Sequence, residues 1–283
     1  MCGIEGIVHF GSVNKEDFVN KVSIMQKITR HRGPDQSDIR VFDQAVLGVS
    51  RLAIVAPNED STIQSAESDS RYALFNGEIV NYRQLRDFLK DPPRDKHCDS
   101  ALILPLYKEF GESFAQKLAG MFAIAIYDQP NNRLQLWRDP LGVKPLYYHQ
   151  ARDQVIFASE AKAVYAAMDN PPEVDFAAVD HILRYRFHPG GSTVFPDIKR
   201  VLPGETVIFE EDKLSRRRYW SLTPNKSEAN PNFGIEQFRA LLTDVIKEHV
   251  QADVKGGFFV SGGLDSSLVT AIALQTPSPY KTP

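Results

Sequence analysis

Short apolar segments rich in strand-forming residues recur through the first 220 residues, and they constrain the fold more than any other feature of the sequence. Residues 121–127 and 133–137 flank Asp128-Gln-Pro-Asn-Asn132, whose residues are typical of a β-hairpin turn. Apolar residues at helical spacing occur between some of these segments but do not alternate regularly with them. The order therefore predicts an α+β fold built in layers rather than a doubly wound parallel sheet.

The composition changes after residue 222, where proline, asparagine and glycine become frequent among lysines and glutamates. We interpret residues 223–232 as a linker between a domain at 2–222 and a second segment at 233–283. The second segment predicts a helix, a short strand at Gly257–Val260, a glycine-rich turn and another helix. This order is typical of the start of a nucleotide-binding α/β domain, which we expect to be truncated here.

Charge and cysteine content exclude several classes of protein. The formal net charge is −3, which gives no electrostatic reason to expect nucleic acid or an anionic membrane as a partner. No stretch of about 18 consecutive apolar residues predicts a transmembrane helix. The two cysteines, Cys2 and Cys98, do not form a disulfide framework, so we expect a reducing, cytoplasmic compartment.

Cys2 is the first residue whose position suggests chemistry. Methionine is normally removed when a small residue follows, so the mature chain would carry a thiol and a free α-amino group on one residue. An α-amino group has a pKa of about 7.7–8.0 and can accept the thiol proton near neutral pH. Many proteins begin with Met-Cys, so this hypothesis needs support from other motifs.

Cys2 is accompanied by further motifs in the same chain, at Met1–Val8, Arg30–Asp35, Ser50–Val55, Phe75–Asn81, Arg138–Tyr148 and Ala158–Lys162. Together these motifs resemble the class II glutamine amidotransferases of the N-terminal-nucleophile family. Within that family the chain is similar to the glutamine-hydrolysing asparagine synthetases, from Cys2 to about residue 275. The resemblance implies a four-layer αββα sandwich followed by the start of an ATP-binding domain of the pyrophosphate-loop type.

The resemblance implies a role for each polar residue of a glutamine site. Asn76 and Gly77 would form the oxyanion hole, where a side-chain amide and a backbone N–H converge on one oxygen. Arg51 would bind the α-carboxylate of glutamine, because a guanidinium matches a planar carboxylate. Glu78 and Asp99 would accept hydrogen bonds from its α-amino group. Two local alternatives stay open: Asn-Gly is a common hairpin turn, and Asp99 can cap a helix.

Three further residues lie in or beside the segments named above. Ala101 stands where the family usually has glutamate, so one carboxylate near Asp99 is missing. We interpret Cys98 as a buried free thiol. We interpret His31 as structural, because the N-terminal amine already supplies a base.

A second site is predicted at residues 261–267, between the expected strand and helix. The segment lacks the lysine of a Walker loop and resembles the pyrophosphate-binding loop of enzymes that adenylate a carboxylate. Glycines and a helix N-terminus suit phosphate, although a simple helix-capping turn is the alternative. The residues assigned to ATP are Ser261, Gly262, Gly263, Asp265 and Ser266, with Asp265 also assigned to Mg²⁺.

These motifs favour an enzyme that hydrolyses glutamine at Cys2 and uses the ammonia to amidate an ATP-activated aspartate. The expected small-molecule partners are glutamine, aspartate and ATP, with Mg²⁺ as cofactor, and a homodimer could complete the truncated sheet. The alternatives are a stand-alone glutaminase, an amidotransferase acting on another carboxylate, and a glutamine sensor without turnover. An intact Cys2 disfavours the sensor, since binding alone needs no nucleophile.

Overall fold

The computed structural model describes residues 1–11, 15–54, 62–66, 70–93, 98–210, 213–223, 234–250, 254 and 256–275. The chain divides into two compact units, one of Met1–Ala53 with Asp60–Ser221 and one of Ile54–Glu59 with Leu222–Pro283. Residues 224–232 of the predicted linker, and the chain after residue 275, lie outside the described residues.

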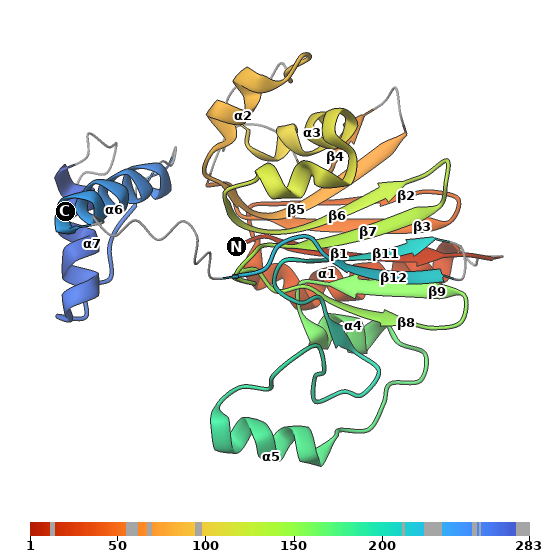
Figure 1. Ribbon diagram of the computed structural model, residues 1–283. Helices are drawn as coiled ribbons and strands as arrows, with labels where there is room; N and C mark the ends of the chain where they lie inside the picture. Colours follow the sequence, from red (N-terminus) through yellow and green to blue (C-terminus); the bar gives the residue numbers. More distant parts are fainter. Residues whose placement is uncertain are drawn as a thin grey trace. The chain divides into compact units, whose positions relative to one another are not determined.

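Two antiparallel sheets, each with six strands among the described residues, form the centre of the first unit (Figure 1). We name them the β1 sheet and the β5 sheet. The strands of the β1 sheet, in their order across it, are β10 (Lys199–Arg200), β8 (Tyr147–Gln150), β9 (Gln154–Ala158), β1 (Gly3–His9), β3 (Ala45–Arg51) and β2 (Gln36–Val41). Those of the β5 sheet are β12 (Lys213–Arg218), β11 (Glu205–Glu210), β7 (Arg133–Arg138), β6 (Gly120–Asp128), β5 (Arg71–Ile79) and β4 (Gln64–Ala66).

Helices cover the outer faces of both sheets. The α-helices of this unit are α1 (Lys15–Thr29), α2 (Tyr82–Phe88), α3 (Ile103–Phe110), α4 (Ala161–Ala167) and α5 (Phe176–Tyr185). Short 3₁₀ helices are η1 (Arg30–Arg32), η2 (Ser100–Leu102) and η3 (Gly111–Lys117). Figure 1 shows α1 and α4 on the side of the β1 sheet and α2 and α3 on the side of the β5 sheet.

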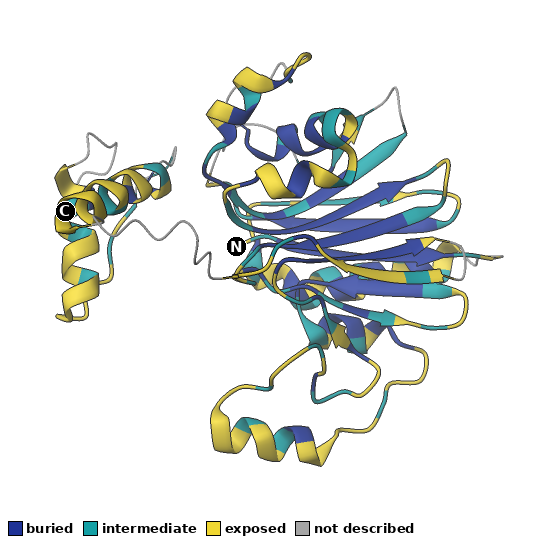
Figure 2. Ribbon diagram, in the orientation of Figure 1, coloured by how far each residue is buried: buried dark blue, intermediate teal, exposed yellow. Residues whose placement is uncertain are grey.

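Alternation of side chains along the strands separates three buried cores. Ile4 and Leu47 of the β1 sheet meet Leu74 and Ala125 of the β5 sheet in the core between the sheets. The outer faces pack in two further cores against α1 with α4 and against α2 with α3. Figure 2 shows the strands as the most buried part of the unit and α5 as largely exposed. The architecture is an αββα sandwich, which confirms the predicted fold class.

The local signals of the sequence give a mixed outcome. The predicted hairpin forms, with β6 and β7 paired across the turn after Asp128. Asp175 caps α5, since its Oδ1 accepts hydrogen bonds from the N–H groups of Ala177 and Ala178 at 2.9 and 3.3 Å. Asn76-Gly77, by contrast, lies inside β5, so the hairpin-turn alternative is wrong.

The second unit contains α6 (Ile235–His249) and α7 (Leu264–Gln275), which share a small buried core at Ile246, Val250 and Ala273. The predicted strand at Gly257–Val260 is wrong, because these residues form no strand and Phe259 is fully exposed. A parallel strand needs neighbouring strands to pair with, and the described residues of this unit contain none. No helix in the described part of the chain is long and apolar enough to cross a membrane.

Glu5 is a buried acidic residue on the outer face of β1, next to the end of α1. Its Oε2 accepts a hydrogen bond from Thr29 Oγ1 at 3.0 Å, whereas Oε1 has no partner among the described residues. Burial raises the pKa of Glu5 to about 8, against smaller opposing effects of Thr29 and Arg32. Glu5 is therefore protonated in the folded protein at neutral pH.

Replacing Glu5 by glutamine should remove a pH dependence of stability. Between about pH 4.5 and 8 the unfolded chain loses the Glu5 proton while the folded chain keeps it, so the free energy of unfolding falls as pH rises. Glu5→Gln keeps the acceptor for Thr29 without a charge. The free energy of unfolding of the variant, relative to that of the parent, should therefore rise by a few kcal/mol from pH 5 to pH 8.

Urea unfolding followed by tryptophan fluorescence measures this effect in the first unit, because both tryptophans, Trp137 and Trp220, belong to it. An equal difference in the free energy of unfolding at pH 5 and pH 8 would show that Glu5 is not buried as a neutral acid.

Candidate active site

Cys2 and Arg51 lie side by side at one end of the β1 sheet. The antiparallel register pairs Gly3 with Ser50, so the residues beyond this pair, Cys2 and Arg51, are neighbours. Ile4 and Val49 belong to the core between the sheets. Because side chains alternate, Cys2 and Arg51 project from the same inner face.

Asn76 and Glu78 project from the inner face of the opposite sheet. Leu74 of β5 lies in the core between the sheets, and Asn76 and Glu78 follow it at the same parity. β1 is in contact with β5, so the two inner faces approach each other at these strands. The fold therefore brings four of the predicted site residues to facing surfaces of the two sheets.

The Cys2 thiol is half-buried and contacts the main chain that follows β3. Its Sγ lies 3.5 Å from the N–H nitrogen of Leu52, which donates to it, and 3.9 Å from the Leu52 carbonyl oxygen. The Cys2 carbonyl accepts a hydrogen bond from Arg32 Nε at 3.1 Å. The nucleophile candidate is thus held on both its side chain and its main chain.

Asn76 has an unsatisfied buried amide. The residue is fully buried, and neither Nδ2 nor Oδ1 has a hydrogen-bond partner among the described residues. Leaving a buried polar group unpaired costs about 1–3 kcal/mol, so such a group is typical of a functional site. A side chain on Gly77 would place its Cβ 2.3 Å from the Met121 carbonyl oxygen, which explains why glycine follows Asn76.

Asp99 lies in the protein interior at the end of β5. Its Oδ2 accepts a hydrogen bond from Ile79 N and its Oδ1 from Ser100 N, both at 2.9 Å. The second contact is the helix-capping role expected as an alternative. The pKa of Asp99 is raised to about 6, because burial, with a smaller contribution from the charge of Glu78, outweighs the hydrogen bonds from the two N–H groups. A cationic ligand at Glu78 and Asp99 would relieve this unfavourable charge.

Arg51 is almost fully buried, and its Nη1 donates to Gln36 Oε1 at 2.6 Å. Gln36 is the residue paired with Arg51 across β2 and β3. The carbonyl of Arg51 also accepts a hydrogen bond from Asp35 N at 3.2 Å. These contacts hold the Arg51 guanidinium next to β2, on the same inner face as Cys2.

Lys144 is a site residue that the sequence reasoning missed. It is 9% exposed, and burial lowers its pKa, while the charges of Glu78 and Cys2 raise it. Lys144 is therefore a candidate for adding positive charge to the site. Lys144 lies in the segment Arg138–Tyr148, which was recognised as a motif without a role for this lysine.

A buried carboxylate fixes the turn that carries Lys144. Asp139 Oδ2 accepts hydrogen bonds from Phe122 N at 3.2 Å and from Lys144 N at 3.0 Å. Its Oδ1 accepts from Leu141 N at 3.1 Å and from Val143 N at 2.9 Å. The turn is therefore bound to β6 of the β5 sheet and holds Lys144 close to that sheet.

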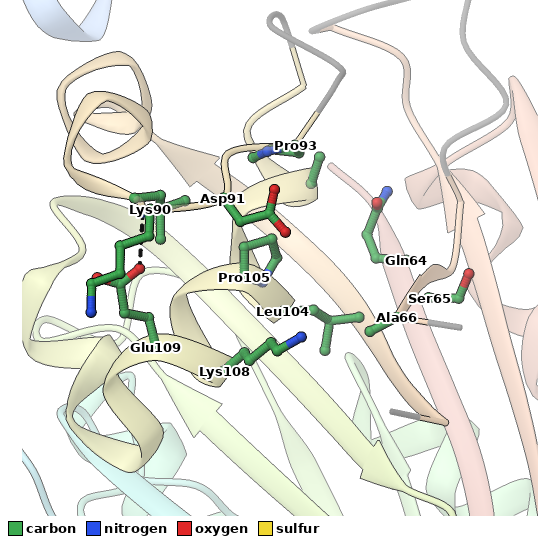
Figure 3. A pocket seen from close by; sticks show the side chains of 12 residues that line it. Gln64, Ser65, Ala66, Lys90, Asp91, Pro93, Leu104, Pro105, Lys108 and Glu109 are labelled. Atoms are coloured by element: carbon green, nitrogen blue, oxygen red, sulfur yellow. Dashed lines mark hydrogen bonds between the residues drawn. The ribbon is translucent and has the colours of Figure 1, made fainter. Parts of the chain in front are cut away.

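A pocket of about 590 Å³ lies elsewhere on the first unit, between β4, α3 and the residues after α2 (Figure 3). Gln64, Asp91 and Lys108 are among the polar side chains that line it. None of the residues predicted for the glutamine site does so, although Ala101 is one of the lining residues. The pocket is therefore separate from the surfaces around Cys2.

The predicted ATP loop precedes α7 in the second unit. Ser261 Oγ lies 3.1 Å from Ser266 Oγ, and Ser266 Oγ donates to the Gly263 carbonyl at 3.2 Å. Gly262 has φ +80°, a conformation that residues with a side chain rarely adopt. Asp265 lies in the first turn of α7 and is exposed.

Solved structures with a similar fold carry related names. A structure called the allosteric regulatory enzyme of purine biosynthesis covers 99% of this chain and 65% of its own, with a TM-score of 0.58 and 18% identity. A glutamine phosphoribosylpyrophosphate amidotransferase from Bacillus subtilis, complexed with ADP and GMP, covers the same shares with a TM-score of 0.55 and 19% identity. At these identities the likeness supports the fold alone.

Curated relatives match the chain along almost all of its length. Asparagine synthetase [glutamine-hydrolyzing] 1 of Bacillus subtilis is 32% identical over 100% of this chain and 45% of its own. A putative asparagine synthetase [glutamine-hydrolyzing] 2 of Methanocaldococcus jannaschii is 31% identical over 96% of this chain and 56% of its own. The chain thus spans about half the length of the curated relatives it matches.

Family models match both parts of the sequence. The model of the asparagine synthase family matches residues 237–282. The model of the glutamine amidotransferase domain matches residues 1–220, which is most of the chain. The chain therefore belongs to the glutamine amidotransferase family.

Proposed function

We propose that the chain hydrolyses glutamine to glutamate and ammonia, with Cys2 as the nucleophile. The observation that carries this proposal is the buried amide of Asn76, which has no hydrogen-bond partner among the described residues and lies opposite the strand that begins beside Cys2. Its Nδ2 donor, next to the N–H of Gly77, suits an oxygen that becomes negatively charged during the reaction.

The chemistry follows from a mature chain that begins with Cys2. The α-amino group takes the thiol proton, and the thiolate attacks the side-chain amide carbon of glutamine. Asn76 and Gly77 stabilise the oxyanion, and the amide nitrogen leaves as ammonia after receiving a proton. Water then attacks the thioester, releases glutamate and returns the thiol.

Three charged residues would hold the amino-acid end of glutamine. Arg51 would bind the α-carboxylate, since its guanidinium is fixed by Gln36 on the inner face from which Cys2 also projects. Glu78 and Asp99 would bind the α-ammonium, which would favour the ionised form of Asp99. Lys144 would add positive charge near the Cys2 thiolate.

We further propose that the ammonia amidates an ATP-activated aspartate in a complete protein of this kind. The names of the curated relatives and the match to the asparagine synthase model support this step. Gly262 provides the positive φ that the turn before α7 requires. The hydroxyls of Ser261 and Ser266, together with the first N–H groups of α7, suit a pyrophosphate. ATP, when bound there, would supply the adenylate that activates the carboxylate.

The remaining residues assigned to ATP fit the same proposal. Gly263 lets the main chain approach phosphate, and Asp265 would help to hold Mg²⁺. No group of three acidic, histidine or cysteine side chains that could bind a metal occurs in the described part of the chain. We therefore expect a further Mg²⁺ ligand to come from outside the described residues. We also propose a cytoplasmic location and a homodimer.

Replacing Cys2 by alanine should abolish glutaminase activity and leave the fold intact, because Cys2 lies at the end of a strand and not in a hydrophobic core. Glutamate release by the chain without Met1 measures this, with the melting temperature as a check on folding. Cys98→Ala is the matched control, since Cys98 is buried and should affect stability only. A tenth of the parent activity in Cys2→Ala would overturn the assignment.

Asn76→Ala and Arg51→Lys should affect different kinetic constants. Losing an oxyanion-hole donor should lower kcat by about 10²–10³-fold with little change in KM. Arg51→Lys replaces a planar fork by a point charge and should raise the KM for glutamine by about tenfold or more. Steady-state kinetics of both variants test the two roles. Variants that lower the melting temperature but leave kcat and KM unchanged would contradict them.

This chain alone should hydrolyse glutamine without forming asparagine, because the described residues of the second unit include no strand next to its phosphate loop. The assay supplies glutamine, aspartate, ATP and Mg²⁺ and measures glutamate, asparagine and pyrophosphate together. Glutamate alone supports the stand-alone glutaminase alternative for this chain. Asparagine formed in step with pyrophosphate would contradict the expectation and indicate that a second copy completes the site.

A further inference from the structure

Glu160, which connects β9 to α4, binds three basic side chains. Its Oε1 accepts hydrogen bonds from His31 Nε2 and Arg32 Nη1, each at 2.9 Å, and its Oε2 accepts one from Lys162 Nζ at 2.9 Å. Burial disfavours the charge of Glu160, but the hydrogen bonds from Lys162, Arg32 and His31 outweigh it and lower the pKa of this carboxyl. Glu160 is therefore an ionised centre of the cluster.

The three ion pairs differ in their exposure to solvent. The side chains of His31 and Lys162 are 56% and 57% exposed, so water and salt weaken their pairs with Glu160. The side chain of Arg32 is only 8% exposed and that of Glu160 18%. The Arg32 pair is therefore the contact in which removal of Glu160 would leave a charge poorly solvated.

Arg32 links Glu160 to the nucleophile candidate. Its Nε donates to the Cys2 carbonyl at 3.1 Å while Nη1 of the same guanidinium donates to Glu160. Because a guanidinium is planar and rigid, the position of Glu160 sets the direction of the Nε–H group. Without Glu160, Arg32 can rotate away from the Cys2 main chain.

The residue before Glu160 holds the same strand by a second route. Ser159 Oγ accepts a hydrogen bond from Ile4 N at 3.0 Å, and Ser159 N donates to the Ile4 carbonyl at 2.8 Å. Residues 159 and 160 thus hold the start of β1 at two points, at Ile4 directly and at Cys2 through Arg32. This arrangement restrains the main chain on which the thiol depends.

We propose that Glu160 is a positioning residue for Cys2 that acts through Arg32. The inference rests on the proposed glutaminase function. Glu160 holds the guanidinium, the guanidinium holds the Cys2 carbonyl, and the thiol and α-amino group of Cys2 keep their orientation toward the substrate. Glu160 itself contacts no substrate, so its loss should slow the reaction without weakening the binding of glutamine.

Glu160→Gln tests this in the full chain without Met1, since the amide has a similar shape but no charge. Glutamate release should show kcat lowered by about tenfold or more, because small displacements of a nucleophile are costly. The KM for glutamine should stay within about twofold of the parent value. Glu173→Gln is the matched control at an exposed position and should match the parent in both constants.

A double-mutant cycle distinguishes positioning through Arg32 from a general loss of structure. Arg32→Ala should lower kcat. Adding Glu160→Gln to it should have little further effect on kcat, because the guanidinium that Glu160 holds is already absent. Glu160→Asp keeps the charge and should retain more activity than Glu160→Gln. If Glu160→Gln does not fold, a kcat-only loss in Glu160→Asp relative to the parent gives the same test.

Each outcome is decisive. Full activity of a folded Glu160→Gln, a rise in KM at unchanged kcat, or losses that multiply in the double variant would overturn the inference while the proposed function stands. A parent chain that releases no glutamate overturns the proposed function itself, and the inference falls with it.

Discussion

The packing of two antiparallel sheets against each other determines where each side chain of the candidate site can point. Residues of one parity on β1, β3 and β5 fill the core between the sheets, and at the ends of these strands the same parity carries polar residues. Cys2 and Arg51 therefore project from one inner face and Asn76 from the opposite one, because Ile4, Val49 and Leu74 are buried together. A shift of one residue in either register would turn these groups to the outer faces.

This arrangement has an energetic cost that packing alone does not explain. Asn76 is fully buried with its amide unpaired among the described residues, and an apolar residue of similar size would be more favourable there. Asp99 is buried with a raised pKa near the carboxylate of Glu78. Both unfavourable groups lie near the same end of β5, which favours a site that a zwitterionic ligand completes over a purely structural role.

The sequence predicted the features that depend on neighbouring residues. Turn residues after Asp128 identified the hairpin of β6 and β7. Local signals failed where distant strands decide the outcome. Asn76-Gly77 resembles a turn but continues β5, because pairing with β6 holds it extended.

Gly257–Val260 has the composition of a strand, but no described strand of its unit pairs with it. The contacts of Glu160 were also beyond local reasoning, since Arg32 is 128 residues away and meets it only because β9 lies beside β1. Such pairings follow from the topology of the sheet. The motifs containing Arg32, Lys144 and Glu160 were recognisable as segments, whereas the roles of these residues required the fold.

We propose that the fold presents Cys2 as a nucleophile to a bound glutamine. Reaction of the chain, without Met1, with a glutamine analogue that carries an electrophilic diazoketone in place of the side-chain amide tests it most directly. Intact-mass and peptide analysis should find one adduct per chain, on Cys2, and excess glutamine should prevent it. An adduct on Cys98, labelling that glutamine does not slow, or no adduct at all would contradict the account.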